Sequence, residues 1–247
     1  MKETRILMGM PITVEIVDAP DHGIIDRVFA YFKGVDDQFS PYKETSELAQ
    51  VNAGLPKSDW SKQMVEVMRL CDMTKRQTNG YFDIHHNGKI DTSGLVKGWA
   101  VQHAAQIVSA AGHKDYYIEA GGDIEVAGVS ADQTPWAVGV RNPFNTDEIV
   151  KVVQLSNRGI ATSGTYIRGE HIYNPHGSSP GANPIRSFTV IGPNVYEADR
   201  FATAAFAMGE NGVHFIERLP GFEAYSINDR HIATLTTGFG NYVKQTA

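Results

Sequence analysis

The chain has 247 residues, of which 42% are hydrophobic and 20% charged, so it can bury a substantial core as one globular unit or two tightly joined lobes. Its formal net charge is −6, and it carries no run of Lys or Arg. This balance argues against a nucleic-acid groove and a basic membrane-surface patch, so we expect no nucleic-acid partner.

The first third of the chain is predicted to be mostly helical, after one strand at residues 10–17. Apolar residues at helical spacing indicate an amphipathic helix over residues 22–39. A short helix is expected to end at Gly54, and a longer one to run over residues 58–78. Cys71, the only cysteine, lies in the longer helix and is expected to be a core residue without a disulfide partner.

The next helix is predicted from about Trp99 to Ala111, and beyond it short strands alternate with turn residues. The expected strands cover residues 115–120, 123–128, 136–141, 149–155, 159–164, 165–168, 171–174 and 186–192. A helix over residues 197–210, another near 211–219 and a hairpin turning at residues 228–229 follow. Because strands and helices do not alternate regularly, the order predicts an α+β fold.

Asp199 and Thr203 lie four residues apart in the predicted helix over residues 197–210, so their side chains share one face of it. A carboxylate and a hydroxyl at this spacing can reach the same point in space. Taken alone, the pair is more simply interpreted as a first-turn Asp facing the helix dipole and a half-buried Thr. Neighbouring motifs have to decide between the two interpretations.

The segment DTSGLVKGWA, residues 91–100, combines two glycines with a lysine. Gly94 and Gly98 flank Lys97 where a loop is expected to enter a helix. Exposed N–H groups, the helix dipole and an ammonium group could converge there on an anion such as phosphate. A solvated lysine at a helix start is the alternative.

Two further glycine-rich segments add polar groups. In EAGGDIEVAG, residues 119–128, two glycines precede Asp123, which indicates close approach of a ligand or a β-bulge. In ATSGTYIRGEHIYNP, Thr162 and Ser163 supply hydroxyl groups and His171 an imidazole on the following strand. A structural histidine is the alternative for His171.

Taken together and in this order, these segments resemble the ApbE family, the FAD:protein FMN transferases. The similar motifs are MGMPITVEI, FSPYKETSELAQVN, GYFDI, IDTSGLVKGWAV, EAGGDIEVAG, ATSGTYIR with HIYNP, and EADRFATAAFAMG. The resemblance implies an α+β, T-fold-like architecture of mixed or antiparallel sheets with packed helices, in a single unit over residues 1–247. It also implies that FAD is the substrate: its pyrophosphate is cleaved with Mg²⁺, and FMN passes to a Thr or Ser of an acceptor flavoprotein.

The resemblance further implies that Asp199 and Thr203 are Mg²⁺ ligands, joined by a main-chain carbonyl near Gly94. Mg²⁺ prefers hard oxygen ligands and is often bound partly by substrate phosphates, which agrees with a site that has only these few protein ligands. Asp199 is thereby also a catalytic residue, and His171 is implied to be the base that takes the acceptor's proton.

The remaining site residues are implied to line the flavin or adenine pockets or to hold the pyrophosphate: Met8, Tyr42, Gly94, Lys97, Gly98, Asp123, Thr162 and Ser163. Tyr42 could stack on a ring of the ligand, and a buried structural tyrosine is the alternative.

The chain also departs from the family's usual pattern. Met10, Gln102 and Asn174 stand where Thr, Asp and Asp are usual, and the connection between GYFDI and IDTSG is short. Residues 85–87 in that connection could cover the flavin in place of the missing segment. A transition-metal site at its two histidines is the alternative, although adjacent residues of an extended stretch point to opposite faces.

Two other functions fit the motifs. One is an FAD pyrophosphatase, in which water replaces the acceptor and FMN and AMP are released; the other is a protein that binds FAD without turnover. The start of the chain has neither an apolar signal nor a lipid-bearing cysteine, and no window of about eighteen apolar residues follows. We expect no membrane segment, and a cytoplasmic protein if Met1 is the natural start or a periplasmic one otherwise.

Overall fold

A computed structural model describes residues 1–18, 22–164, 173–177 and 183–244. Its centre is an eight-stranded sheet in the order β1-β2-β5-β6-β9-β10-β11-β12, in which every neighbouring pair is antiparallel. The strands are β1 Lys2–Leu7, β2 Met10–Ile16, β5 Tyr116–Ala120, β6 Asp123–Ala127, β9 Arg158–Gly164, β10 Ile185–Gly192, β11 Glu223–Asn228 and β12 Ala233–Leu235.

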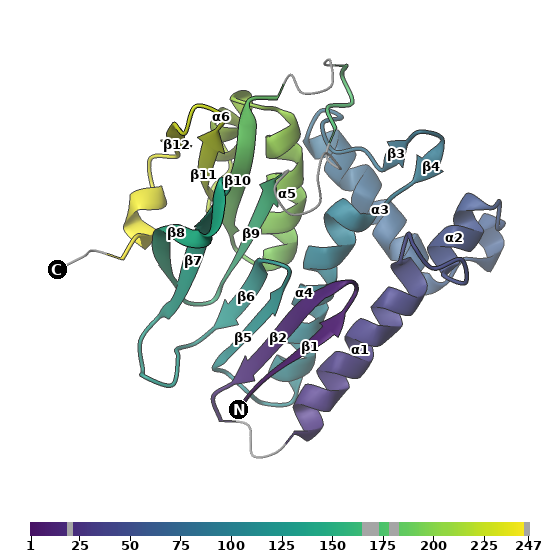
Figure 1. The fold of residues 1–247 in the computed structure, drawn as a ribbon. Helices are drawn as coiled ribbons and strands as arrows, with labels where there is room; N and C mark the ends of the chain where they lie inside the picture. Colours follow the sequence, from purple (N-terminus) through teal and green to yellow (C-terminus); the bar gives the residue numbers. More distant parts are fainter. Residues whose placement is uncertain (19–21, 165–172, 178–182, 245–247) are drawn as a thin grey trace.

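Helices cover one face of this sheet (Figure 1). α4 and α5 contact its strands, and α1 and α3 contact α4. The helices are α1 Gly23–Phe39, α2 Glu47–Asn52, α3 Lys62–Gln77, α4 Ser93–Ala110, α5 Val195–Ala207 and α6 Asn211–Glu217, with 3-10 turns η1 Lys57–Asp59 and η2 Phe239–Tyr242. The α+β fold is as predicted. In the part of the chain described, no helix is both long and apolar enough to cross a membrane.

Two separate hairpins complete the fold: β3 His85–His86 with β4 Lys89–Ile90, and β7 Trp136–Asn142 with β8 Asn145–Leu155. The second hairpin packs on the sheet face opposite to the helices. Ala161 and Val190 belong to the core beneath α5, whereas their neighbours Ile160 and Ile191 belong to the core shared with β7 and β8. Successive strand residues point to opposite faces, so one sheet serves both cores.

The start of α4 differs from the prediction and changes the setting of the lysine motif. The helix begins at Ser93, six residues before Trp99, and the Ser93 N–H donates to the Asp91 carboxylate at 2.8 Å. That side chain satisfies one of the N–H groups a helix start leaves open. Lys97 and Gly98 therefore lie in the second turn of the helix and not in a loop that leads into it.

Three other expectations are corrected by the backbone. The strand β1 was not predicted, because an edge strand with alternating exposed polar residues shows little apolar pattern. The helix predicted over residues 58–78 begins only at Lys62, because the Ser61 hydroxyl accepts from the Met64 N–H at 3.1 Å and caps it there. The helix predicted over residues 197–210 begins at Val195, which moves Asp199 into the second turn.

The segment EAGGDIEVAG contains a tight turn and no bulge. Gly121 and Gly122 have φ of +56° and +93° and connect the paired residues Ala120 and Asp123. A two-residue hairpin turn with both φ values positive requires residues such as glycine. The turn places Asp123 at the first position of β6.

The expected strands after Gly164 mostly fall outside the described residues. All of residues 165–168 and the first two residues of 171–174 lie there, and so does His171. Tyr173 and Asn174 are described and have no strand structure, so the strand predicted at residues 171–174 is wrong for these two.

Candidate active site

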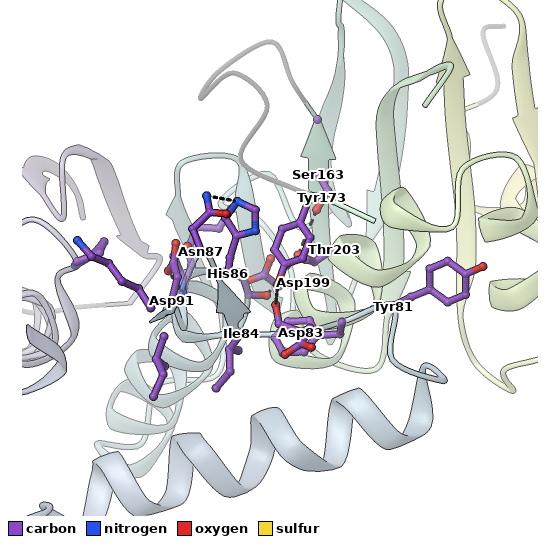
Figure 2. Close-up of a pocket in the computed structure, with 18 of the residues that line it drawn as sticks. Tyr81, Asp83, Ile84, His86, Asn87, Asp91, Ser163, Tyr173, Asp199 and Thr203 are labelled. Carbon is purple, nitrogen blue, oxygen red and sulfur yellow. Dashed lines mark hydrogen bonds between the residues drawn. The ribbon is translucent and has the colours of Figure 1, made fainter. Parts of the chain in front are cut away.

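A cavity of about 480 Å³ opens where α4, α5, β9 and the β3–β4 hairpin meet (Figure 2). Its size is typical of small-molecule sites, which span about 300–1,000 Å³. The glycine-lysine motif, the hydroxyl residues of β9 and the carboxylate–hydroxyl pair of α5 all contribute to its wall. The predicted site residues that line it are Gly94, Lys97, Thr162, Ser163, Asp199 and Thr203.

Asp199 is placed by a close crossing of α4 and α5 at Gly98. A Cβ atom added at Gly98 would lie 2.6 Å from the Asp199 Cβ and 2.9 Å from the Val195 carbonyl oxygen, so only glycine allows this approach. The Gly98 N–H donates to Asp199 Oδ2 at 2.8 Å. The carboxyl group is therefore fixed in direction although it is only 3% exposed.

Thr203 lies one turn further along α5 and joins two other oxygen groups. Its hydroxyl donates to the Gly94 carbonyl at 3.3 Å, and the Ser163 hydroxyl lies 3.4 Å from it. Figure 2 shows Ser163, Asp199 and Thr203 around the same cavity. Residues from α4, α5 and β9 thus bring a carboxylate, hydroxyls and a main-chain carbonyl to one place.

Lys97 lines the cavity and is paired with a buried acid. Its Nζ lies 2.7 Å from Asp123 Oδ2, and the Asp123 side chain is completely buried. The Thr162 N–H donates to the other carboxyl oxygen of Asp123 at 3.2 Å. Asp123 therefore acts behind the cavity wall and holds the lysine, while Lys97 remains at the surface of the cavity.

The charges at this crossing do not balance among the described residues. Burial raises the pKa of Asp199 well above its ordinary value, and the negative charge of Asp123 adds to the effect; Lys97 and the Gly98 N–H act in the opposite direction. The buried carboxyl group of Asp199 lies near the Lys97–Asp123 pair, and a cation bound at Asp199 would favour the ionised form of Asp199. The carboxylate, hydroxyl and carbonyl oxygens of Asp199, Thr203 and Gly94 are ligand atoms of the kind that Mg²⁺ prefers, and the site fits that ion.

Besides Asp123, three predicted residues that the structure describes do not line the cavity: Met8, Tyr42 and Gly98. Met8 is half-buried in the β1–β2 turn with φ of +54° and does not line the cavity. Tyr42 is 91% exposed, so the alternative of a buried structural tyrosine is wrong, and its neighbour Pro41 lines the cavity instead. Gly98 acts only through Asp199. The base assigned to His171 lies outside the described residues and stays a prediction.

The β3–β4 hairpin was not predicted from the sequence, although it lines the site. His86, Asn87, Lys89 and Ile90 from this hairpin line the cavity, as does Tyr173, which contacts the hairpin. Its two strands have two residues each, too short for a periodic pattern. The turn itself, Asn-Gly at residues 87–88, is the usual signal of a two-residue hairpin and would have located it. Within the described ranges, no group of three or more His, Cys, Asp or Glu is placed to hold a metal.

These features define an α+β protein with a polar pocket built at a crossing of two helices on an antiparallel sheet. The model of the ApbE family matches residues 8–88 and 84–226, which is most of the chain. The chain belongs to the ApbE family.

Relatives and solved structures agree with this assignment. The chain is 31% identical over 130 residues to the FAD:protein FMN transferase of Vibrio cholerae, an alignment that covers 49% of this chain and 39% of that protein. It is 29% identical over 147 residues to the protein of the same name from Escherichia coli K12. That alignment covers 56% of this chain and 42% of the Escherichia coli protein. The matched part thus spans less than half of each relative's length.

The fold is that of solved ApbE proteins. The flavin transferase ApbE from Vibrio cholerae superposes with a TM-score of 0.86 at 20% identity, covering 98% of both chains. The ApbE protein of Thermotoga maritima superposes with a TM-score of 0.86 at 20% identity, covering 99% of both chains. At this identity the likeness establishes the fold, and the predicted ApbE-like α+β architecture is confirmed.

Proposed function

We propose that the protein is an FAD:protein FMN transferase that cleaves the FAD pyrophosphate and attaches FMN to a Thr or Ser of an acceptor flavoprotein. The observation that carries the proposal is the convergence of Asp199, Thr203 and the Gly94 carbonyl on one cavity, in a chain whose relatives bear this name. The cavity has room for a small-molecule ligand, with oxygen groups at the helix crossing and aromatic groups at the hairpin.

The reaction is a phosphoryl transfer in which one bond forms and one breaks. The acceptor's hydroxyl oxygen bonds to the phosphorus of the FMN half, the bond from that phosphorus to the AMP oxygen breaks, and AMP leaves with the electron pair. The hydroxyl proton passes to a base, for which His171 is the predicted residue. Such transfers depend mostly on positioning and on charge stabilisation.

Asp199, Thr203 and the Gly94 carbonyl would hold Mg²⁺, which supplies charge stabilisation at the pyrophosphate when bound. The chain's own contribution is to orient these groups. The Gly98 N–H fixes the direction of the Asp199 carboxylate, and the Lys97–Asp123 pair keeps an ammonium group at the cavity surface. Lys97 lines the cavity and would interact there with the phosphates of a bound dinucleotide.

The test is to incubate the full chain with FAD, Mg²⁺ and a panel of candidate acceptor flavoproteins, each paired with a variant whose acceptor hydroxyl residue is alanine. A transferase adds to the acceptor the mass of FMN less one water and leaves the alanine partner unchanged. Release of free FMN and AMP with every acceptor unmodified identifies a pyrophosphatase, and intact FAD identifies a binding protein. Either of these results contradicts the proposal.

A further inference from the structure

The β3–β4 hairpin lines the cavity, but it has no assigned role in the proposed transfer reaction. Its turn is Asn87–Gly88, with φ of +50° and +74°, and His86 and Asn87 face the cavity. The connection is too short to form a longer covering segment. What the hairpin contributes must therefore come from the few side chains that it carries.

Two rings from distant parts of the chain form a stack at this rim. The His86 imidazole lies on the Tyr173 ring with centroids 4.0 Å apart and planes inclined by 29°. Both residues line the cavity, so both rings contribute to its wall (Figure 2). This part of the wall contains two aromatic rings, in contrast to the oxygen groups of Asp199, Thr203 and Ser163.

The stack is held in place before any ligand arrives. The Tyr173 hydroxyl is shared between the main-chain carbonyls of His85, at 2.7 Å, and Asp83, at 3.1 Å. On the other strand, the Asn52 amide donates to the Ile90 carbonyl at 2.9 Å and accepts from the Ile90 N–H at 2.7 Å. Hydrogen bonds thus fix both strands of the hairpin, which lowers the ordering cost of binding.

We infer that the His86–Tyr173 stack is the platform on which a flat heteroaromatic ring of the bound dinucleotide packs. The inference rests on the proposed function and extends it: the Asp199 end of the cavity holds phosphate, and the hairpin end selects a ring. Aromatic rings stack on nucleotide bases irrespective of their hydrogen-bonding edges, so the flavin and the adenine share this chemistry. The residues that bind the ring are His86 and Tyr173, while Asn52 positions the hairpin.

The two halves of FAD serve as separate probes, because neither contains a pyrophosphate and neither can be cleaved. FMN and AMP are titrated with Mg²⁺ into the full chain and into Tyr173→Leu, with affinity measured by calorimetry and flavin stacking by fluorescence quenching. We expect the affinity for one of the two to fall about 5- to 150-fold, which is the stacking loss of about 1–3 kcal/mol converted at 1.4 kcal/mol per factor of ten. The half that loses affinity is the half whose ring the platform holds.

A matched control exists in the same chain. Phe144 stacks on His231 with centroids 3.8 Å apart and planes inclined by 23°, and neither ring lines the cavity. Phe144→Leu makes the same kind of change as Tyr173→Leu and should leave both affinities as in the parent. Circular dichroism and melting curves of all variants verify that each is folded.

Tyr173→Phe separates the ring from its hydroxyl. If the ring binds the ligand, this variant keeps most of the parent's affinity and quenching, whereas Tyr173→Leu loses both. A loss as large as that of the Leu variant would assign Tyr173 to anchoring the hairpin and would overturn the platform.

The platform and the transferase fail in different ways. Unchanged affinity of Tyr173→Leu for both FMN and AMP overturns the platform whatever the transfer assay gives. A parent that binds these probes with the expected loss in Tyr173→Leu, yet transfers no FMN, supports the platform and contradicts only the transferase.

Discussion

The α4–α5 crossing and the β3–β4 hairpin meet at one cavity and are built in opposite ways. At the crossing, Gly98 and Asp199 are buried, and the carboxyl group is held by a main-chain N–H from the middle of a helix. At the hairpin, His86 and Asn87 are exposed, and side chains from other segments hold its strands in place.

The difference teaches how far the site can change without affecting the fold. A substitution at the crossing that changes side-chain volume alters packing that the sheet and two helices share, so its effect on binding or activity comes with a loss of stability. A substitution at the hairpin removes exposed groups, which usually changes the free energy of unfolding little. Each prediction below tests one side of this contrast.

The largest effect is expected from Asp199→Asn, which keeps the shape of the side chain and removes its charge. Loss of one charge-stabilising group in an active site typically costs about 10²–10³-fold in kcat. We expect at least that loss in Mg²⁺-dependent FAD cleavage, measured by single-turnover release of AMP. The pKa of Asp199 is raised in the parent, so the neutral amide should be tolerated and the melting temperature kept or increased. Turnover within a few-fold of the parent in the folded variant would refute the assignment.

Beneath the start of α5, strand β6 carries Glu125, whose Oε2 accepts from the Val195 N–H at 2.5 Å. Burial raises its pKa from 4.5 to about 7 against the opposing effect of that N–H. At pH values between 4.5 and about 7, Glu125 is therefore ionised in the unfolded chain while it still holds its proton in the folded protein. The free energy of unfolding should therefore fall by up to about 3 kcal/mol as pH rises from about 4.5 to 7, and stay level above that.

Glu125→Gln isolates this contribution, because the other titrating groups are common to both proteins. The stability of the parent minus that of the variant, from denaturant unfolding at a series of pH values, should decline from pH 4.5 to 7. Parallel curves would show that Glu125 has an ordinary pKa in the fold.

A smaller loss of stability is expected from Gly98→Ala. The added methyl group would overlap the Asp199 Cβ at 2.6 Å, and overpacking of this kind costs about 1–3 kcal/mol. For a chain of this length we expect a drop in melting temperature of roughly 2–12 °C. Gly34, in α1, is the matched control, because a Cβ there meets nothing within 4 Å. Gly34→Ala should stabilise the protein by about 0.5–1 kcal/mol, and equal shifts in the two variants would argue against the close crossing.

The smallest global effect is expected at the hairpin, from Asn52→Ala. The variant loses two hydrogen bonds to Ile90, each with a net contribution of about 0.5–1.5 kcal/mol, but at an exposed position where water replaces them. Hydrogen exchange at the Ile90 amide should become faster while the melting temperature changes by only a few degrees. A cooperative loss of stability as large as that of Gly98→Ala would place the hairpin in the same unit as the crossing.

The sequence was informative about the crossing wherever a local pattern carries the information. The spacing of Asp199 and Thr203 is enough to put both on one face of α5, and the structure places both at the cavity. The glycines around Lys97 were interpreted as part of an anion site, which stays a prediction. The close approach of α5 at Gly98 was not predicted, because a helix packed against a glycine leaves no local trace in the sequence.

Contacts between distant segments could not be predicted. The ion pair of Lys97 with Asp123 and the stack of His86 on Tyr173 depend on how the sheet brings separate segments together. Tyr42 shows the converse: its motif suggested a ring contact, but its exposure is decided by the chain around it. Local propensity gives the elements, while tertiary packing decides which side chains share a cavity.

The hydrogen bond from Gly98 to Asp199 joins residues that are 101 positions apart, which sets the time at which the pocket can form during synthesis. A ribosome adding about 5–20 residues per second needs roughly 5–20 s to pass from one to the other. Until α5 has been made, Gly98 has no helix packed against it, and the Lys97–Asp123 pair lacks the nearby carboxyl group of Asp199. The nascent chain thus lacks the Asp199 end of the pocket, so the dinucleotide of the proposed function would enter a finished fold and would not act as a template for it.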